Sequence, residues 1–214
     1  TPAGWDLLIA LALIWGFELI GSAAIGVAFV VANPGTDPTA VLTRHPVPLL
    51  AFSLVSVVFA LIVAWYFLCR KYHKRFTEGF ALRAVRLRSI LVSILLAVGG
   101  MLVAVCLIGD KEPGDSPLTQ MLSTPLGALA FMALAVIVPP LEELYYRGFL
   151  YAVLEKHTGT VAAVILVSAW FAGMHAFQLA GECSGLAIVA VMGTLWTLQR
   201  CLTRSLIPSI VTHW

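Results

Sequence analysis

Long apolar stretches separated by short polar segments run through the whole chain. A membrane-spanning helix needs about 20 largely apolar residues, and helices are one of only two structures that satisfy their backbone groups within lipid. We expect spans at about 5–31, 47–69, 89–108, 125–157, 160–179, 185–199 and from Ser205 onward. The pattern therefore predicts an all-α, polytopic transmembrane helical bundle of about seven to eight spans.

The polar segments between these stretches carry helix-breaking signals. Four prolines fall between positions 33 and 48, and the acidic segment 110–115 contains both proline and glycine. Gly159 is a natural helix stop. With no internal repeat in the sequence, a single membrane domain over residues 1–214 is the simplest organisation. The chain starts without Met and stops inside an apolar stretch, so we expect residues to be missing at both ends.

The composition excludes a soluble domain. Hydrophobic residues make up 60% of the chain and charged residues 11%, and the mean hydropathy is +0.96. A net charge of +2 gives no indication of nucleic-acid binding. The four cysteines, Cys69, Cys106, Cys183 and Cys201, show no CxxC spacing and are interpreted as small apolar fillers. The lipid bilayer is therefore the first partner that the sequence predicts.

Basic residues set the predicted orientation in the cell membrane. Seven of the thirteen Lys and Arg residues lie in the segment 70–88, and cytoplasmic loops carry such an excess. This multi-pass protein is therefore predicted to have its N-terminus and the segment 70–88 in the cytoplasm. Alternation of the spans places Lys156, Arg200 and Arg204 on the same side. An anionic-lipid surface is an alternative interpretation of the charge at 70–88.

One motif places charges inside an apolar neighbourhood. Residues 126–138 carry no charge, and Glu142, Glu143 and Arg147 follow directly after Pro139-Pro140. A charge at the centre of a spanning helix costs about 2.5–3.5 kcal/mol on insertion scales, so such residues usually face a partner, a cavity or a reaction. Glu143 and Arg147 are four residues apart and can form an ion pair on one helical face. The side chain of Glu142 points about 100° around the helix from that of Glu143, so Glu142 lacks this partner.

The proline pair before the motif has two interpretations. Pro139 and Pro140 cannot donate backbone hydrogen bonds, so they would either kink the span or begin a new half-helix. In the second case both glutamates would lie in a first helical turn, where the helix dipole favours negative charge.

Spacing suggests that His175 is the partner of Glu142. If residues 126–157 and 160–179 form an antiparallel hairpin, both side chains lie about 25 Å from the turn, with Phe171 one turn before His175. His213 adds an ionisable group from the last apolar stretch. Glutamate with histidine suits activation of a water by general-base chemistry. Glu142, His175 and His213 would equally suit a divalent metal such as zinc, and spacing does not choose between the two.

At these residues the chain resembles the CPBP family of intramembrane proteases, also called the Abi or CAAX-protease-like family. This family includes the prenyl-protein endopeptidases of the Ras-converting type. Its pattern is EExxxR, then FxxxH, then HxxxN or HxxxD, on successive membrane helices. The chain supplies EELYYR at 142–147, FAGMH at 171–175 and then His213. The resemblance covers about residues 120–214.

The resemblance implies an intramembrane endopeptidase, a hydrolase acting on a peptide or protein substrate. Residues 120–214 would form the catalytic core around a conical catalytic cavity between helices, and residues 1–119 would supply supporting helices. We expect a glutamate-type mechanism without a cofactor rather than a zinc-dependent one. Nothing in the sequence distinguishes a prenylated substrate from an unmodified peptide.

The resemblance also implies a role for each motif residue. Glu142 and His175 would activate the attacking water, Glu143 and Arg147 would support the site, and His213 would stabilise the oxyanion of the tetrahedral intermediate. The polar residue that the family carries four positions after this last histidine would lie beyond the end of the chain.

A non-catalytic function fits the same charges. In a bacteriocin-immunity factor, a scaffold or a small transporter, buried charges would only hold helices together. A cavity at Glu142 open to the inner half of the membrane favours the enzyme, whereas a fully packed Glu142 without a cavity favours the alternative. The combination of motifs favours the protease.

Overall fold

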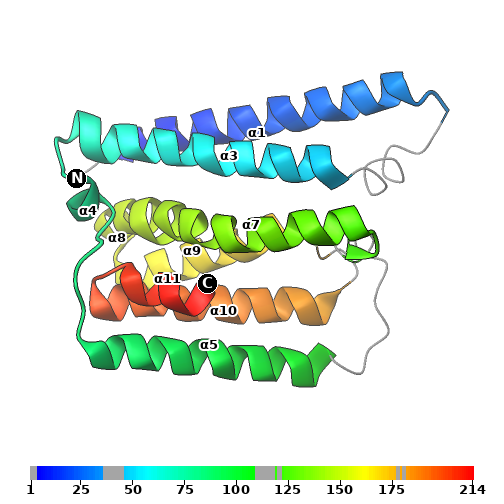
Figure 1. Ribbon diagram of the computed structural model, residues 1–214. Coiled ribbons are helices and arrows are strands. Elements are labelled where there is room, and N and C mark those ends of the chain that lie inside the picture. Colours follow the sequence, from blue (N-terminus) through cyan, green and yellow to red (C-terminus); the bar gives the residue numbers. More distant parts are fainter. Residues whose placement is uncertain (1–3, 36–45, 109–118, 120–121, 177–178, 180–181) are drawn as a thin grey trace.

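The computed structural model in Figure 1 describes residues 4–35, 46–108, 119, 122–176, 179 and 182–214. Over these ranges the chain forms helices and no strand, as predicted. The elements are α1 (Gly4–Ala32), α3 (Pro46–Trp65), the π-helix η1 (Tyr66–Lys71), α4 (Phe76–Gly79), α5 (Leu87–Ile108), α7 (Pro125–Glu143), the π-helix η2 (Leu144–Leu150), α8 (Tyr151–Thr158), α9 (Thr160–His175), α10 (Cys183–Thr203) and α11 (Ile207–His213).

Among the residues that the structure describes, five helices are long and apolar enough to cross a membrane. They cover Gly4–Ala32, Ala51–Lys71, Leu87–Cys106, Pro125–Thr158 and Cys183–Thr203. This confirms a polytopic helical bundle. Two predicted spans are shorter than expected within the described residues. The 16 residues of α9 rise about 24 Å, less than the roughly 30 Å of a hydrocarbon core, and α11 has 7 residues.

The helix that carries the charged motif runs without a break. Thr124 caps it by accepting from the Gly127 N–H at 3.1 Å, and Pro125 occupies an early position that needs no donor. Pro139 and Pro140 lie inside α7, so of the two interpretations of the proline pair the start of a new half-helix is wrong. The irregular part lies beyond them, where η2 widens the helix into a π-helical stretch. Such stretches often occur at functional sites.

The predicted helix stop at Gly159 is confirmed, whereas the predicted loops fall mainly outside the described residues. Gly159 has φ of +81°, which glycine adopts without steric cost, and its N–H bonds to the Glu155 carbonyl at 3.0 Å. The acidic segment 110–115 and most of the proline-rich segment lie outside the described ranges.

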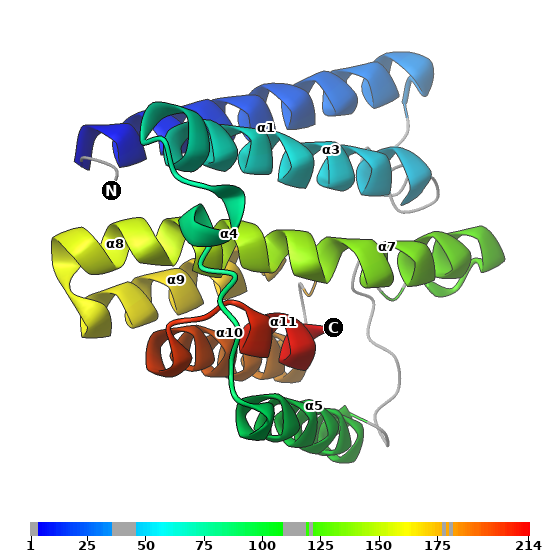
Figure 2. The same ribbon diagram turned by 60° about the vertical axis from the view of Figure 1, so that its left-hand side comes forward.

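The continuous helix α7–η2–α8 lies at the centre of the bundle (Figure 1, Figure 2). On one side α3 packs against it, with α1 outside α3, and on the other side lie α9 and α10. The short α11 packs against α10, α7 and α5. The buried side chains around η2 are Tyr145, Tyr146, Phe149 and Leu150 from η2 itself, Phe67 and Leu68 from η1, and Phe171 from α9. The π-helical stretch therefore lies in the core.

One end of the bundle collects the basic residues. Figure 1 shows the start of α1, the end of η1, α4, the α8–α9 turn and the end of α10 at this end. Asp6 in α1 accepts hydrogen bonds from Lys71 and Tyr72, which fastens α1 to the basic segment. The alternation of spans is therefore as predicted. That this end faces the cytoplasm remains a prediction.

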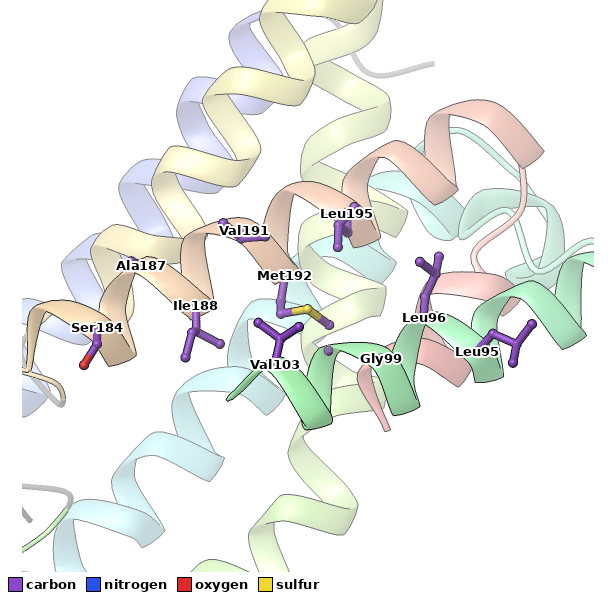
Figure 3. Close-up of a pocket in the computed structure, with 11 residues that line it drawn as sticks. Leu95, Leu96, Gly99, Val103, Ser184, Ala187, Ile188, Val191, Met192 and Leu195 are labelled. Carbon is purple, nitrogen blue, oxygen red and sulfur yellow. The ribbon is translucent and has the colours of Figure 1, made fainter. Parts of the chain in front are cut away.

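An apolar groove separates α5 from α10 (Figure 3). Its volume is about 490 Å³. The lining residues are Leu95, Leu96, Gly99, Gly100 and Val103 from α5, and Ser184, Ala187, Ile188, Val191, Met192 and Leu195 from α10. The groove includes no residue of the charged motif.

Candidate active site

Glu143 and Arg147 form the buried electrostatic centre of the site. Both side chains are fully buried, and Nη1 of Arg147 donates to Oε1 of Glu143 at 2.9 Å. This is the ion pair that the four-residue spacing predicts. The same guanidinium donates from Nε to Thr197 Oγ1 at 3.2 Å and from Nη2 to the Gly193 carbonyl at 2.8 Å. Arg147 therefore joins the central helix to α10.

Gly193 and Thr197 were not identified from the sequence. Thr197 also donates to the Gly193 carbonyl at 2.7 Å, so both act on Arg147 from one turn of α10. A Cβ at Gly193 would lie 2.8 Å from Cδ1 of Phe171, which explains the absence of a side chain. Their Gly-xxx-Thr spacing, which allows helices to approach closely, is the signal that could have identified them.

His213, at the end of α11, contacts this buried centre. Its Nδ1 lies 2.9 Å from Oε1 of Glu143, and its Nε2 lies 3.8 Å from Oε2 of Glu142. An ionised carboxylate only accepts hydrogen bonds, so Nδ1 of His213 carries the hydrogen. The sequence showed no charged neighbour for this histidine, and the fold supplies two.

Aromatic rings enclose the histidines. The Trp196 ring stacks on the His213 ring, with centroids 3.6 Å apart and an interplanar angle of 20°. Phe171 meets the His213 ring edge-on at 5.8 Å and packs against the His175 ring at 4.5 Å. The guanidinium of Arg147 lies 4.5 Å from the Phe171 centroid. Phe171 therefore forms a wall beside His175, as its position one turn earlier suggested.

His175 ends α9, next to this wall. Its Nδ1 lies 2.8 Å from the Phe171 carbonyl, which can only accept, so Nδ1 is the donor and Nε2 is left as the reactive nitrogen. In the structure the imidazole that faces Glu142 at 3.8 Å is that of His213. The direct pairing of Glu142 with His175 remains a prediction.

The two adjacent glutamates have different surroundings. Glu143 is fully buried, and its Oε1 contacts both Arg147 and His213. The Glu142 side chain keeps 16% of its surface exposed, and within the described residues its ion-pair contact is the one to His213. Oε2 of Glu143 has no hydrogen-bond partner either, but it is fully enclosed, so Glu142 is the carboxylate that another group can reach.

Comparison with protein families gives one match. Residues 124–214 match the family described as type II CAAX prenyl endopeptidase Rce1-like. This region is therefore similar to the CAAX-protease family. The expected resemblance is thereby confirmed, and the family consists of proteases, which are hydrolases. Comparisons with curated proteins and with solved structures give no match.

The donor atoms of the CAAX-protease region do not form a ready metal centre. Over the described part of the chain, no group of three His, Cys, Asp or Glu side chains is arranged to hold a metal ion. Nδ1 of His175 and Nδ1 of His213 are each occupied by an oxygen of the protein. The donor atoms left on this set are Nε2 of His175, Nε2 of His213 and the Glu142 carboxylate, and these atoms would have to hold any metal.

The predicted conical cavity remains a prediction. The groove between α5 and α10 is lined by neighbours of the site, Met192 and Leu195, but not by Glu142, His175 or His213. Glu142 is nevertheless not fully packed. The CAAX-protease region thus leaves its candidate base accessible.

Gly193→Ala tests the tight packing at Arg147. The new Cβ would lie 2.8 Å from Phe171 and 3.4 Å from Nη2 of Arg147, so we expect the free energy of unfolding to fall by about 1–3 kcal/mol. Reversible unfolding in detergent measures this change. Gly16→Ala is the matched control, because nothing lies within 4 Å of a Cβ at Gly16. Equal stability of the two variants would contradict the packing argument.

Proposed function

We propose that the chain is an intramembrane endopeptidase in which Glu142 acts as general base. The observation that carries this proposal is the difference between the adjacent glutamates. Glu143 already serves Arg147 and His213, whereas Glu142 is partly exposed and faces Nε2 of His213. The match of residues 124–214 to a protease family supports the same assignment.

The proposed reaction is hydrolysis of a peptide bond. The Glu142 carboxylate accepts a proton from a water molecule while the water oxygen attacks the carbonyl carbon of the substrate. When the tetrahedral intermediate collapses, the C–N bond breaks and the proton passes from Glu142 to the leaving amine. The products are one new carboxylate and one new amine. We assign the Nε2 atom of His175 to orienting the water.

His213 is assigned to the oxyanion of the intermediate. Because Nδ1 is bound to Glu143, only Nε2 is available for the substrate. A hydrogen on Nε2 requires the imidazolium form, whose positive charge would lie between the Glu143 carboxylate and the face of the Trp196 ring. Glu143 and Arg147 are thus positioning residues that hold this donor in place.

The Trp196 stack gives a prediction about positioning. In Trp196→Leu the His213 ring loses its stacked neighbour, so we expect kcat to fall roughly threefold to tenfold with little change in KM. Trp196→Phe should restore most of the rate. Trp170→Leu is the control, because the ring of Trp170 packs edge-on against Trp15 of α1. Equal losses of activity in the Trp196→Leu and Trp170→Leu variants would contradict a positioning role.

A cleavage assay tests the function. The purified full chain in lipid is given a quenched fluorescent peptide ending in a CAAX sequence, with and without a prenyl group on its cysteine. We propose the prenylated peptide as substrate, because the matching family is described as a prenyl endopeptidase. Mass spectrometry locates the broken bond, and a chelator such as EDTA should leave the rate unchanged. Absence of cleavage of both peptides would contradict the proposal.

A further inference from the structure

Two buried arginines of the bundle differ in how they are satisfied. Arg147 donates to Glu143, Thr197 and Gly193. Arg200, in the last turns of α10, is only 8% exposed, yet its side chain forms no hydrogen bond or ion pair with the residues that the structure describes. Its Nε is enclosed and has no partner. A guanidinium is always charged and carries five donors, so this arrangement lacks an anion.

The surroundings of Arg200 include one carboxylate, that of Glu155, but no anion in direct contact with the guanidinium. The guanidinium lies 5.4 Å from the centroid of the Tyr151 ring, and the other groups that act on it are Glu155, Arg83 and Cys201. Oε1 of Glu155 already accepts from the Tyr151 hydroxyl at 2.8 Å and from Thr160 at 3.1 Å, and Glu155 forms no ion pair with Arg200. Arg83 adds a second positive charge to the same neighbourhood.

The position of Arg200 in the bundle indicates where an anion would come from. The end of α10 lies with the basic segment, the α8–α9 turn and α4 at one end of the bundle (Figure 1). The segment around Arg83 is held there, because Ser205 Oγ donates to the Arg83 carbonyl at 2.6 Å and Leu206 N–H donates to the Ala81 carbonyl at 2.9 Å. The ends of membrane-spanning helices lie at the level of the lipid headgroups.

We propose that Arg200 binds the phosphate group of a membrane lipid. A guanidinium can donate two parallel hydrogen bonds to a phosphate, and it is more weakly hydrated than an ammonium group, so it suits a half-enclosed site. The Tyr151 ring and Arg83 complete a site with one aromatic wall and a second positive charge. The proposal does not depend on the proteolytic function.

The experiment compares lipid binding by variants of the full chain in detergent. The probes are dioctanoyl phosphatidylglycerol, a monoacylglycerol of the same chain length without phosphate, and inorganic phosphate. Native mass spectrometry measures binding, and the unfolding temperature measures stabilisation. Arg200→Met keeps the apolar bulk of the side chain and removes the charge. Arg200→Lys keeps the charge but cannot donate the two parallel hydrogen bonds of a guanidinium. Arg204→Met, an exposed arginine four residues on, is the matched control.

We expect phosphatidylglycerol to stabilise the native protein and to bind Arg200→Met at least about tenfold more weakly. The affinity of Arg204→Met for phosphatidylglycerol should stay within about twofold of the native value. The affinity of Arg200→Lys should lie between those of the native protein and Arg200→Met. Without lipid, Arg200→Met should unfold no earlier than the native chain, because it loses an unpartnered buried charge.

Four results would overturn the proposal. Equal binding of phosphatidylglycerol to the native protein and Arg200→Met would remove the assigned contact. Equal stabilisation by the phosphate-free lipid would show that only the acyl chain is recognised. Equal stabilisation by inorganic phosphate would assign the site to a free anion instead of a lipid. Earlier unfolding of Arg200→Met in the absence of lipid would show that Arg200 has its partner within the protein.

Discussion

Glu142→Gln should lower kcat for peptide cleavage by a factor of about 100 to 10,000, the range that a positioned general base contributes. Glutamine has the same shape as glutamate but cannot take up the proton of the attacking water. KM should change little, because the substitution removes an interaction needed in the transition state and not in binding. Initial rates with the peptide that the native protein cleaves, measured over a range of concentrations, separate the two constants.

The same variant should keep the fold. Glu142 lies partly exposed and at 3.8 Å from His213, so its replacement should change the free energy of unfolding by less than about 1 kcal/mol. Glu78→Gln in the exposed helix α4 removes one negative charge away from the site and should keep the native rate. Native-like cleavage by Glu142→Gln would refute the general-base assignment and leave the non-catalytic interpretation as the better one.

Arg147→Met should destabilise the protein by about 3–5 kcal/mol, because it leaves the Glu143 carboxylate buried without its main cationic partner. The hydrogen bonds to Thr197 and Gly193 are lost at the same time. Reversible unfolding in detergent measures the free energy. Arg86→Met, at an exposed position of the basic segment, is the control and should lie close to the native stability.

A second substitution distinguishes a lost charge pair from lost volume. In the double variant Glu143→Gln with Arg147→Met the uncompensated charge is gone, so most of the stability should return. Cleavage should stay impaired, because His213 no longer has a negatively charged neighbour at Nδ1. If the double variant is as unstable as Arg147→Met alone, packing and not electrostatics explains the loss.

The order of the helices was predictable because it depends only on where the runs of apolar residues lie along the chain. Runs of about 20 apolar residues can lie in lipid only as helices, and most of the predicted span boundaries agree with the structure to within a few residues. The ion pair of Glu143 with Arg147 was predictable for a similar reason, since residues four apart share a helical face. The role of Pro139 and Pro140 was not predictable, because the helix continues through both prolines and widens only beyond them, in η2.

Contacts between distant parts of the chain could not be predicted. Glu143 and His213 are 70 residues apart, and Arg147 and Thr197 are 50 apart, yet each pair is joined by a hydrogen bond. Helical periodicity relates only residues a few positions apart, so it carries no information about such pairs. The depth argument placed Glu142 and His175 at one level, but it could not tell which imidazole would turn toward Glu142.

By itself, therefore, the sequence determined that the chain is a helical membrane protein and which of its helices carry acids and histidines. Hydrophobic length and local spacing are sufficient for these conclusions. Only the tertiary structure decided which glutamate is enclosed with Arg147 and His213 and which stays partly exposed. That choice depends on how α10 and α11 pack against the central helix, because their packing brings Thr197, Gly193 and His213 to Arg147 and Glu143.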